Sequence, residues 1–332
     1  MQGRLENKIK RERVIENLLM DMPQYVTKYY YNLSSSRESS SCLEYIRKIR
    51  RFLLFLNEDM DAINIREVSD VDVSKFLKKI ETKEKNGNIE MTSFSTWKQY
   101  HTTLNSFFRY LCKRGYVNSN PVEGIERIRK NDKVQHDFLS AKDLKEILRA
   151  VDYGAGNRRS MNRQREWRSR DKAIMLTFVT TGMRETALCE IDINRIDFAR
   201  KTIVVTDKEN KDNSYTMTPE LISAYYDWLE DREKKLDGKS CDALFISNRR
   251  ERITSRSVID LVRKYTFEGI GKEVSPHRLR AAYGNILLQE TGDIYFVSKA
   301  MKHANVQTTE IYIQNNEKDV NDRVANIMNK IF

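Results

Sequence analysis

Apolar side chains recur every three to four residues through much of the first third of the chain, the spacing that places them on one face of an α-helix. One such run covers residues 43–56, and two similar runs predict helices over about 71–80 and 94–112. The buried face expected of the first helix is made by Leu43, Ile46, Ile49, Leu53 and Leu56.

No strand-like alternation interrupts this region, so residues 20–126 are predicted to form a small all-helical domain. Residues 1–19 form an extension with room for one additional helix. The segment 127–138 is basic, polar and aperiodic, which is typical of a linker. Two interpretations stay open for it: an extended segment that passes around a DNA duplex, or an ordinary exposed connection.

The remaining residues, 139–332, show both helical and strand-like spacing of apolar side chains. Two β-branched runs, Ile203–Thr206 and Ser214–Met217, enclose the polar letters KENKDN, the pattern of a β-hairpin. The chain is therefore predicted to be mainly α with a small antiparallel β-sheet, in two domains. The expected helices of the second domain lie at Ser140–Ala150, Asp171–Thr181 and Leu221–Leu236, with a candidate strand at Ala243–Ile246 and mostly helix thereafter.

Charge points to a polyanionic partner. The 332 residues include 59 Lys and Arg against 48 Asp and Glu, a net charge of +11, which favours nucleic acid or an anionic membrane surface. No membrane span is expected, because no stretch approaches the roughly 18 consecutive apolar residues that a spanning helix needs. The basic stretch Asn157–Arg170 could line a phosphate backbone, but its composition is more typical of a solvated loop.

The four cysteines are scattered, and none forms a Cys-x-x-Cys pair. Their spacing argues against a zinc site and against a disulfide framework. A reducing cytoplasm is the expected location, and no metal or cofactor is expected. The cysteines are Cys42, Cys112, Cys189 and Cys241.

One motif places two reactive side chains at the start of a predicted helix. In SPHRLRAAYG, Ser275 stands at the cap position and Pro276 at the first helical position. His277 and Arg280 are three residues apart, so both side chains fall on one face near the positive end of the helix, where an anion is stabilised.

Four further residues have ordinary interpretations when each is taken singly. Arg184, in TTGMRETAL, follows a helix that ends at Gly182, and Lys208 lies at the tip of the predicted hairpin. His303 stands near the end of an apolar helix, and Tyr312 lies nine residues later. Single residues of these types are usually solvated or part of a core, so any functional prediction rests on their combination.

In this order and spacing, the combination resembles the tyrosine recombinase (phage integrase) family, including the integrases of conjugative transposons and Xer-type recombinases. Residues 20–126 resemble the family's SAM-like core-binding domain, and residues 139–332 resemble its catalytic domain. The resemblance implies a two-domain DNA clamp. The six positions that match the family's catalytic residues are Arg184, Lys208, His277, Arg280, His303 and Tyr312.

The resemblance implies cleavage of DNA by Tyr312, which would form a 3′-phosphotyrosyl link and release a 5′-hydroxyl. Charge builds on the non-bridging phosphate oxygens during this attack, and one preorganised donor there is typically worth about 3–4 kcal/mol. Arginine suits the task because its planar fork reaches two oxygens and stays protonated. Arg184 and Arg280 are the expected clamp, with His303 as a further donor.

Two proton transfers complete the implied reaction. A tyrosine with a pKa of about 10 must lose its proton to attack, and His277 is the expected base. The departing 5′-oxygen needs a proton, for which Lys208 is the expected general acid. A 5′-hydroxyl from a second strand can then attack the covalent link, so strands are exchanged through a Holliday junction without ATP or a metal.

Two positions depart from the family's pattern. The glycine that usually precedes the second family histidine is Lys302 here, and the acidic residue usually found three positions after the first arginine is Ala187. Because that acid supports the arginine in relatives, Glu185 or Glu190 is the candidate support for Arg184.

The resemblance also implies partners. Strand exchange between two duplexes needs four active subunits, so a homotetramer on double-stranded DNA with inverted-repeat core sites is expected. The last residues carry apolar side chains at helical spacing, and they could dock on a neighbouring subunit or on their own domain. These positions are Val320, Val324, Ile327 and Ile331.

Alternative functions differ in what happens to the DNA. Integration and excision of a mobile element is favoured by the two departures and by the stretch after Arg184, and Xer-like resolution of chromosome or plasmid dimers is the alternative. A type IB topoisomerase shares the chemistry but acts as a monomer, and the small helical first domain argues against it. A non-catalytic DNA-binding protein on the same fold is opposed by the intact set of six residues.

Overall fold

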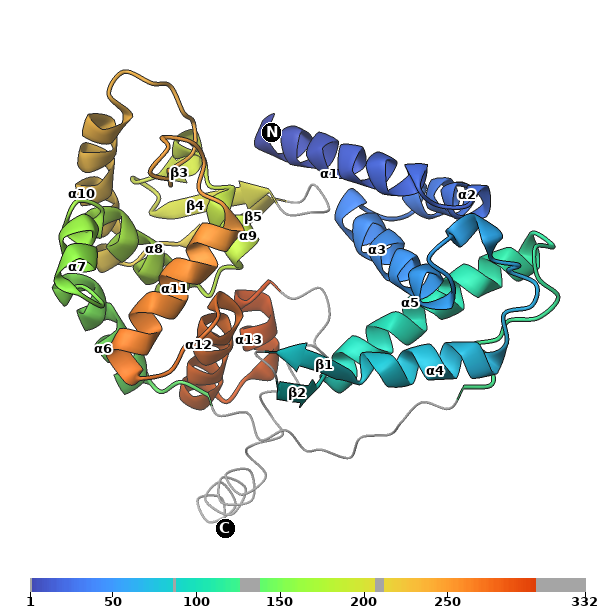
Figure 1. Ribbon diagram of the computed structural model, residues 1–332. Helices are drawn as coiled ribbons and strands as arrows, with labels where there is room; N and C mark the ends of the chain where they lie inside the picture. The colour runs from blue at the N-terminus through green and yellow to red at the C-terminus, as the bar shows by residue number, and fades with distance from the viewer. Residues whose placement is uncertain (1, 86–87, 126–137, 207–211, 303–332) are drawn as a thin grey trace, which may run out of the picture. The chain divides into compact units, whose positions relative to one another are not determined.

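The computed structural model describes residues 2–85, 88–125, 138–206 and 212–302. The chain divides into two compact units, residues 1–133 and 134–332, and both are built mainly of helices (Figure 1). The predicted class, mainly α with a small antiparallel sheet, is confirmed. The predicted linker lies outside the described residues except for Phe138.

Helices of the first unit pack around an aromatic-rich core. They are α1 (Gln2–Met20), α2 (Gln24–Ser34), α3 (Ser39–Leu56), the 3-10 turn η1 (Met60–Ala62), α4 (Asp70–Ile80) and α5 (Phe94–Lys113). The ring of Phe52 in α3 lies 5.1 Å from that of Phe76 in α4 and 5.9 Å from that of Phe108 in α5, both edge to face. The amphipathic faces predicted for these three helices are therefore confirmed as one shared core.

The prediction of an all-helical first domain is wrong at one place. Between α4 and α5 the chain forms an antiparallel hairpin, β1 (Thr82–Lys85) and β2 (Asn88–Met91), in which Lys85 pairs with Asn88. The letters between them, Asn86-Gly87, are the dipeptide that most strongly signals a tight hairpin turn. The strands escaped prediction because they are short and mostly polar, without an apolar face.

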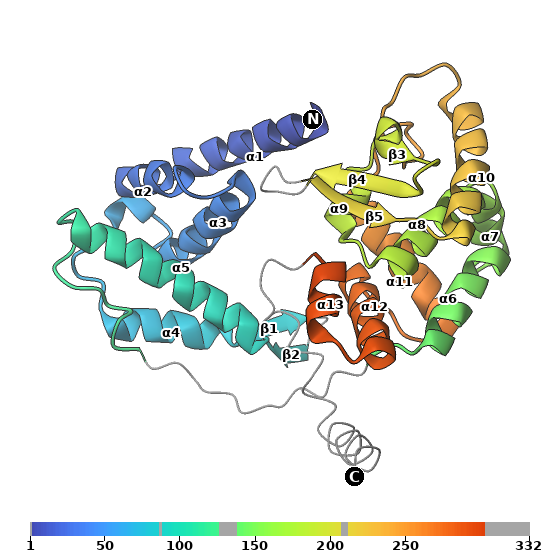
Figure 2. The same ribbon diagram turned by 180° about the vertical axis from the view of Figure 1, so that it is seen from behind.

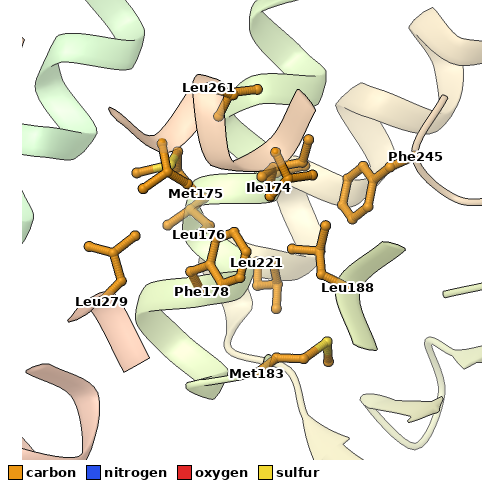
Figure 3. Close-up of a cluster of buried hydrophobic side chains, with 14 of the residues drawn as sticks. Ile174, Met175, Leu176, Phe178, Met183, Leu188, Leu221, Phe245, Leu261 and Leu279 are labelled. Atoms are coloured by element: carbon orange, nitrogen blue, oxygen red, sulfur yellow. The ribbon is translucent and has the colours of Figure 1, made fainter. Parts of the chain in front are cut away.

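The second unit surrounds one buried helix. Its helices are α6 (Ala141–Tyr153), α7 (Arg158–Arg165), α8 (Arg168–Thr181), α9 (Glu185–Cys189), the 3-10 turn η2 (Ile193–Arg195), α10 (Pro219–Leu236), α11 (Ser255–Ile270), α12 (Pro276–Thr291) and α13 (Ile294–Ala300). Figure 3 shows Ile174 and Phe178 of α8 with Leu261 of α11 and Leu279 of α12 in the surrounding core. The site-bearing segments are thus attached to α8 by apolar packing.

Hydrogen bonds fix both ends of α8. At its start, Asp171 is 2% exposed and accepts hydrogen bonds from Tyr265 Oη (2.7 Å) and Arg170 Nη2 (2.8 Å). Burial, together with the Asp171 charge, raises the pKa of Tyr265. At its end, Gly182 adopts the left-handed conformation (φ 60°), and its N–H donates to Phe178 O at 3.0 Å.

A three-stranded antiparallel sheet stands beside these helices, as seen from both sides in Figures 1 and 2. Strands β4 (Thr202–Thr206) and β5 (Asp212–Thr216) confirm the predicted hairpin, and Thr206 pairs with Asp212. The edge strand β3 (Ile196–Asp197), of only two residues, was not predicted.

Two local predictions for the second unit are wrong. The basic stretch forms α7 and the start of α8 rather than a loop. The Asn157 side chain caps α7 by accepting from Ser160 N–H. The buried Gln164 amide bonds both the N–H and the carbonyl of Ala155, at 2.8 and 2.7 Å. The candidate strand Ala243–Ile246 makes only single bridges to neighbouring segments. It is held instead by Arg232, whose guanidinium donates to Ala243 O.

Candidate active site

The structure describes three of the six predicted site residues. Arg184 follows α8, and His277 and Arg280 belong to α12. The other three predicted residues, Lys208, His303 and Tyr312, lie outside the described part of the chain.

Arg280 joins two segments that lead to other site residues. Its side chain is 2% exposed, Nη1 donates to Gly182 O at 2.6 Å, and Nη2 donates to Met301 O. Gly182 precedes Arg184 by two residues, and Met301 precedes His303 by two. One guanidinium therefore ties the end of α8 to the end of α13, a contact that no local sequence signal predicts.

Arg184 occupies the N-cap position of α9, directly after the turn that Arg280 contacts. The preceding side chain, Met183, is fully buried in the core, whereas Arg184 is half-buried. The Arg184 carbonyl accepts the first helical hydrogen bond of α9, from Leu188 N–H at 3.0 Å. Packing of α12 on α8 thus brings Arg280 into contact with the turn that leads to Arg184.

His277 is the second residue of α12, after Pro276 at the first helical position, as predicted. It is exposed, whereas Arg280 one turn later is buried. His277 thus lies at the solvent-exposed first turn of α12, whereas the Arg280 guanidinium is turned to the carbonyls of Gly182 and Met301. An anion at this positive helix end would meet the imidazole first.

The structure gives a physical account of the departure at Lys302. This residue has a φ of 53°, in the left-handed region that a glycine adopts without steric cost. The backbone therefore keeps the conformation expected of a glycine, although a lysine stands there.

The second departure, Ala187, packs against the core of the second unit. Glu185 and Glu190 stand at the two ends of α9 and are half-buried. A supporting role of either carboxylate for Arg184 stays a prediction.

A groove of about 500 Å³ lies in the first unit, between the starts of α3 and α5. Three cationic side chains face it against one carboxylate, Glu44, which pairs with Lys48 at 3.4 Å. Such donors suit phosphate oxygens and base edges. The groove is lined by Arg37, Ser40, Ser41, Glu44, Tyr45, Lys48, Ser95, Lys98, Gln99, Thr102 and Thr103.

Among the described residues, a buried thiol and the potential metal ligands do not form a second reactive site. Burial raises the pKa of the Cys189 thiol to about 12, so this thiol stays protonated at neutral pH. Among the residues described, no group of three or more His, Cys, Asp or Glu side chains could hold a metal ion. Nor is any helix described here long and apolar enough to cross a bilayer.

Comparison with known proteins identifies the family. Residues 137–319 match the phage integrase family, and residues 26–115 match the phage integrase N-terminal SAM-like domain. The chain belongs to the phage integrase family. A tyrosine recombinase of Pseudothermotoga lettingae is 28% identical over 290 residues, 86% of this chain and 90% of that protein.

A second relative of this integrase-family protein is the tyrosine recombinase XerC of Alcanivorax borkumensis. It is 28% identical over 212 residues, 64% of this chain and 66% of XerC. The chain thus spans about two thirds of the length of that relative.

Solved structures establish the same fold. The XerH site-specific recombinase bound to its difH substrate superposes with a TM-score of 0.68, at 21% identity over 87% of this chain and 80% of XerH. The Tn1549 transposon integrase bound to transposon end DNA gives 0.66, at 17% identity over 91% of this chain and 98% of that one. A λ integrase bound to a core site gives 0.63, at 18% identity over 89% and 95%.

Proposed function

We propose that this integrase-family protein is a site-specific recombinase that cleaves and rejoins double-stranded DNA through a 3′-phosphotyrosyl intermediate. The observation that carries the proposal is the double contact of Arg280 with Gly182 and Met301. It assembles the α8 and α13 ends around the first turns of α12, within a chain that has all six family residues in order.

In the proposed reaction, the Tyr312 hydroxyl attacks phosphorus while His277 accepts its proton. The bond from phosphorus to the 5′-oxygen breaks, and Lys208 supplies the proton to that oxygen. Arg184 and Arg280 hold the non-bridging oxygens with His303 as a third donor. One phosphodiester is replaced by another, so rejoining needs no external energy source.

The groove of the first unit is the proposed contact for base edges and backbone phosphates. Its lining includes hydroxyl, amide and cationic groups, which can bond phosphate oxygens and base edges. Cationic side chains there would hold the duplex, while Ser, Thr and Gln side chains would read its sequence.

Two biological roles differ in the DNA they act on. The departures at Ala187 and Lys302 favour integration and excision of a mobile element, and the XerC relative favours resolution of dimers as the second candidate. In either role we propose a homotetramer on inverted-repeat core sites, in the cytoplasm, with the C-terminal segment that carries Val320, Val324, Ile327 and Ile331 docked on a neighbouring subunit or on its own. Sequencing the DNA that flanks the gene separates the roles, since element ends would be found only in the first.

The deciding experiment removes the hydroxyl group of Tyr312, the proposed nucleophile. Duplexes made from the flanking DNA are incubated with the protein, and covalent adducts are scored on a denaturing gel. Tyr312→Phe is expected to bind these duplexes as the wild type does and to form no adduct. The matched control is Tyr295→Phe, an exposed tyrosine of α13, which should leave adducts unchanged.

Adducts that persist in Tyr312→Phe would place the nucleophile elsewhere. A wild type that binds but never forms adducts would indicate the non-catalytic alternative. A topoisomerase would relax supercoiled plasmid as a monomer and give no products in a two-site recombination assay.

A further inference from the structure

Two side chains of α12, three positions apart in the sequence, contact the same glycine. Arg280 donates to the Gly182 carbonyl oxygen, and Tyr283, one turn later, packs on the Gly182 Cα. A methyl group built on Gly182 would lie 2.8 Å from Cγ and Cε1 of the Tyr283 ring and closer still to Cδ1. Because real side chains do not approach so closely, the ring occupies the space that a larger residue at 182 would need.

Tyr283 also contacts the other segment that Arg280 holds. Its half-buried ring packs against the cluster that Leu288 of α12 forms with Val297 and Met301 of the α13 segment. Burial raises the pKa of the Tyr283 hydroxyl, while the nearby Arg280 charge lowers it and Tyr215 of β5 raises it. The ring therefore lies on Gly182 at the end of α8 and against the apolar cluster of α12 and α13.

The turn at Gly182 is restrained by its own hydrogen bonds and by the burial of the next side chain. Gly182 N–H is bonded to α8, its carbonyl is bonded to Arg280, and the next side chain, Met183, is fully buried. Arg184 follows immediately as the N-cap of α9. The direction in which Arg184 leaves the turn is therefore set by how firmly Gly182 is held.

We propose that Tyr283 is a positioning residue that acts through Arg184, by pressing its ring on Gly182 and so orienting the turn that presents this arginine to the scissile phosphate. The inference rests on the proposed function for its catalytic consequence. The ring, and not the hydroxyl, carries the effect, because the atoms that approach Gly182 are ring carbons.

The first measurement needs no DNA. Amide hydrogen exchange is compared over residues 181–185 of the full chain in the wild type, Tyr283→Leu and Tyr283→Phe. Exchange should rise about tenfold or more in Tyr283→Leu and stay near wild type in Tyr283→Phe. The control is Phe198→Leu, which removes another half-buried ring of the same unit, stacked 4.6 Å from Tyr226, and should leave this segment unchanged.

The second measurement is the single-turnover rate of adduct formation on a duplex that the wild type cleaves. Tyr283→Leu should lower this rate roughly 10- to 100-fold with little change in DNA affinity, and Tyr283→Phe should restore it. In an Arg184→Lys background, Tyr283→Leu should cost less than about threefold, because the residue it acts through is already altered.

Additive losses in the Arg184→Lys background, or unchanged exchange at 181–185 in Tyr283→Leu, would overturn the proposal. A wild type without adducts on any flanking duplex contradicts the proposed function alone, since the exchange measurement still decides whether Tyr283 holds the turn.

Discussion

Two buried arginines in the second unit donate hydrogen bonds to backbone carbonyl oxygens. Arg280 bonds the carbonyls of Gly182 and Met301, and Arg232, which is 1% exposed, bonds those of Cys241 and Ala243. A guanidinium suits this task because its planar fork reaches two acceptors and keeps its charge when buried. Arg280 is therefore a cross-link of the fold as well as a proposed phosphate ligand.

Replacing Arg280 should cost stability as well as chemistry. Arg280→Ala leaves two buried carbonyls without this donor, so we expect the free energy of unfolding to fall by about 2–4 kcal/mol. Adduct formation should fall steeply while most DNA affinity remains. Thermal unfolding of the full chain checks the first effect, with Arg159→Ala on the exposed face of α7 as control. An unchanged unfolding midpoint for Arg280→Ala would show that its hydrogen bonds contribute nothing to the fold.

Because the backbone at Lys302 is left-handed, we expect glycine at this position to stabilise the fold and valine to destabilise it. Lys302→Gly relieves the steric cost of a positive φ, partly offset by greater freedom of the unfolded chain, so the unfolding free energy should rise by roughly 0.5–1 kcal/mol. Lys302→Val should lower it by about 1 kcal/mol or more, because a β-branched residue fits this region poorly. Equal losses in both variants, measured by thermal unfolding, would refute the conformational explanation.

Local capping determines where several elements begin. At α6, the Ser140 hydroxyl accepts from Asp143 N–H (3.2 Å), and the Asp143 carboxylate accepts from Ser140 N–H (2.8 Å). The same reciprocal box opens α4 with Ser69 and Asp72. These contacts join residues three apart, which is why the start of α6 is readable from sequence.

Capping at α6 should give a pH-dependent contribution to stability. Hydrogen bonds from the Ser140 backbone and side chain lower the pKa of Asp143. A carboxyl with a lowered folded pKa stabilises the fold above its unfolded pKa, about 3.9, and this contribution is lost as the pH falls through the folded pKa. Asp143→Ala should therefore cost about 1 kcal/mol at pH 7 and progressively less as the pH falls through the folded pKa.

The matched control is Asp152→Ala on the same helix, whose carboxylate pairs with Lys172 at the surface (2.8 Å) and caps no helix start. It should cost less than about 0.5 kcal/mol at pH 7. Equal losses for the two variants, followed by thermal unfolding across pH, would contradict the capping explanation.

Two of the elements that prediction missed lack an apolar pattern. The β1–β2 hairpin is short and polar, and α7 is fixed to its unit by the amide of Gln164 rather than by an apolar stripe. Hydrophobic periodicity detects only elements that bury one apolar face. For the hairpin, the Asn-Gly dipeptide was the available signal.

At the scale of the whole molecule, a net charge of +11 predicts binding to DNA that depends strongly on salt. The logarithm of affinity should fall with the logarithm of salt concentration at about −0.9 per phosphate neutralised. Lys98→Gln, in the groove of the first unit, should reduce the magnitude of that slope by about 1. The control is Lys234→Gln, whose amine pairs with Glu230 at 2.7 Å on α10 and should leave the slope unchanged. A slope near zero for the wild type would contradict binding through the backbone.

Sequence alone determined the main helices of both units, the β4–β5 hairpin and the family, because amphipathic spacing, caps and the order of polar residues are all local properties of the chain. The sequence also identified Arg184, His277 and Arg280 as candidate site residues, but it did not show which contacts position them. That Arg280 reaches the carbonyls of Gly182 and Met301, that Tyr283 fills the space over Gly182, and that Lys302 takes a left-handed backbone were decided by tertiary structure. Each of these features depends on packing between α8, α12 and α13, and contacts between segments so far apart leave no periodic trace in the sequence.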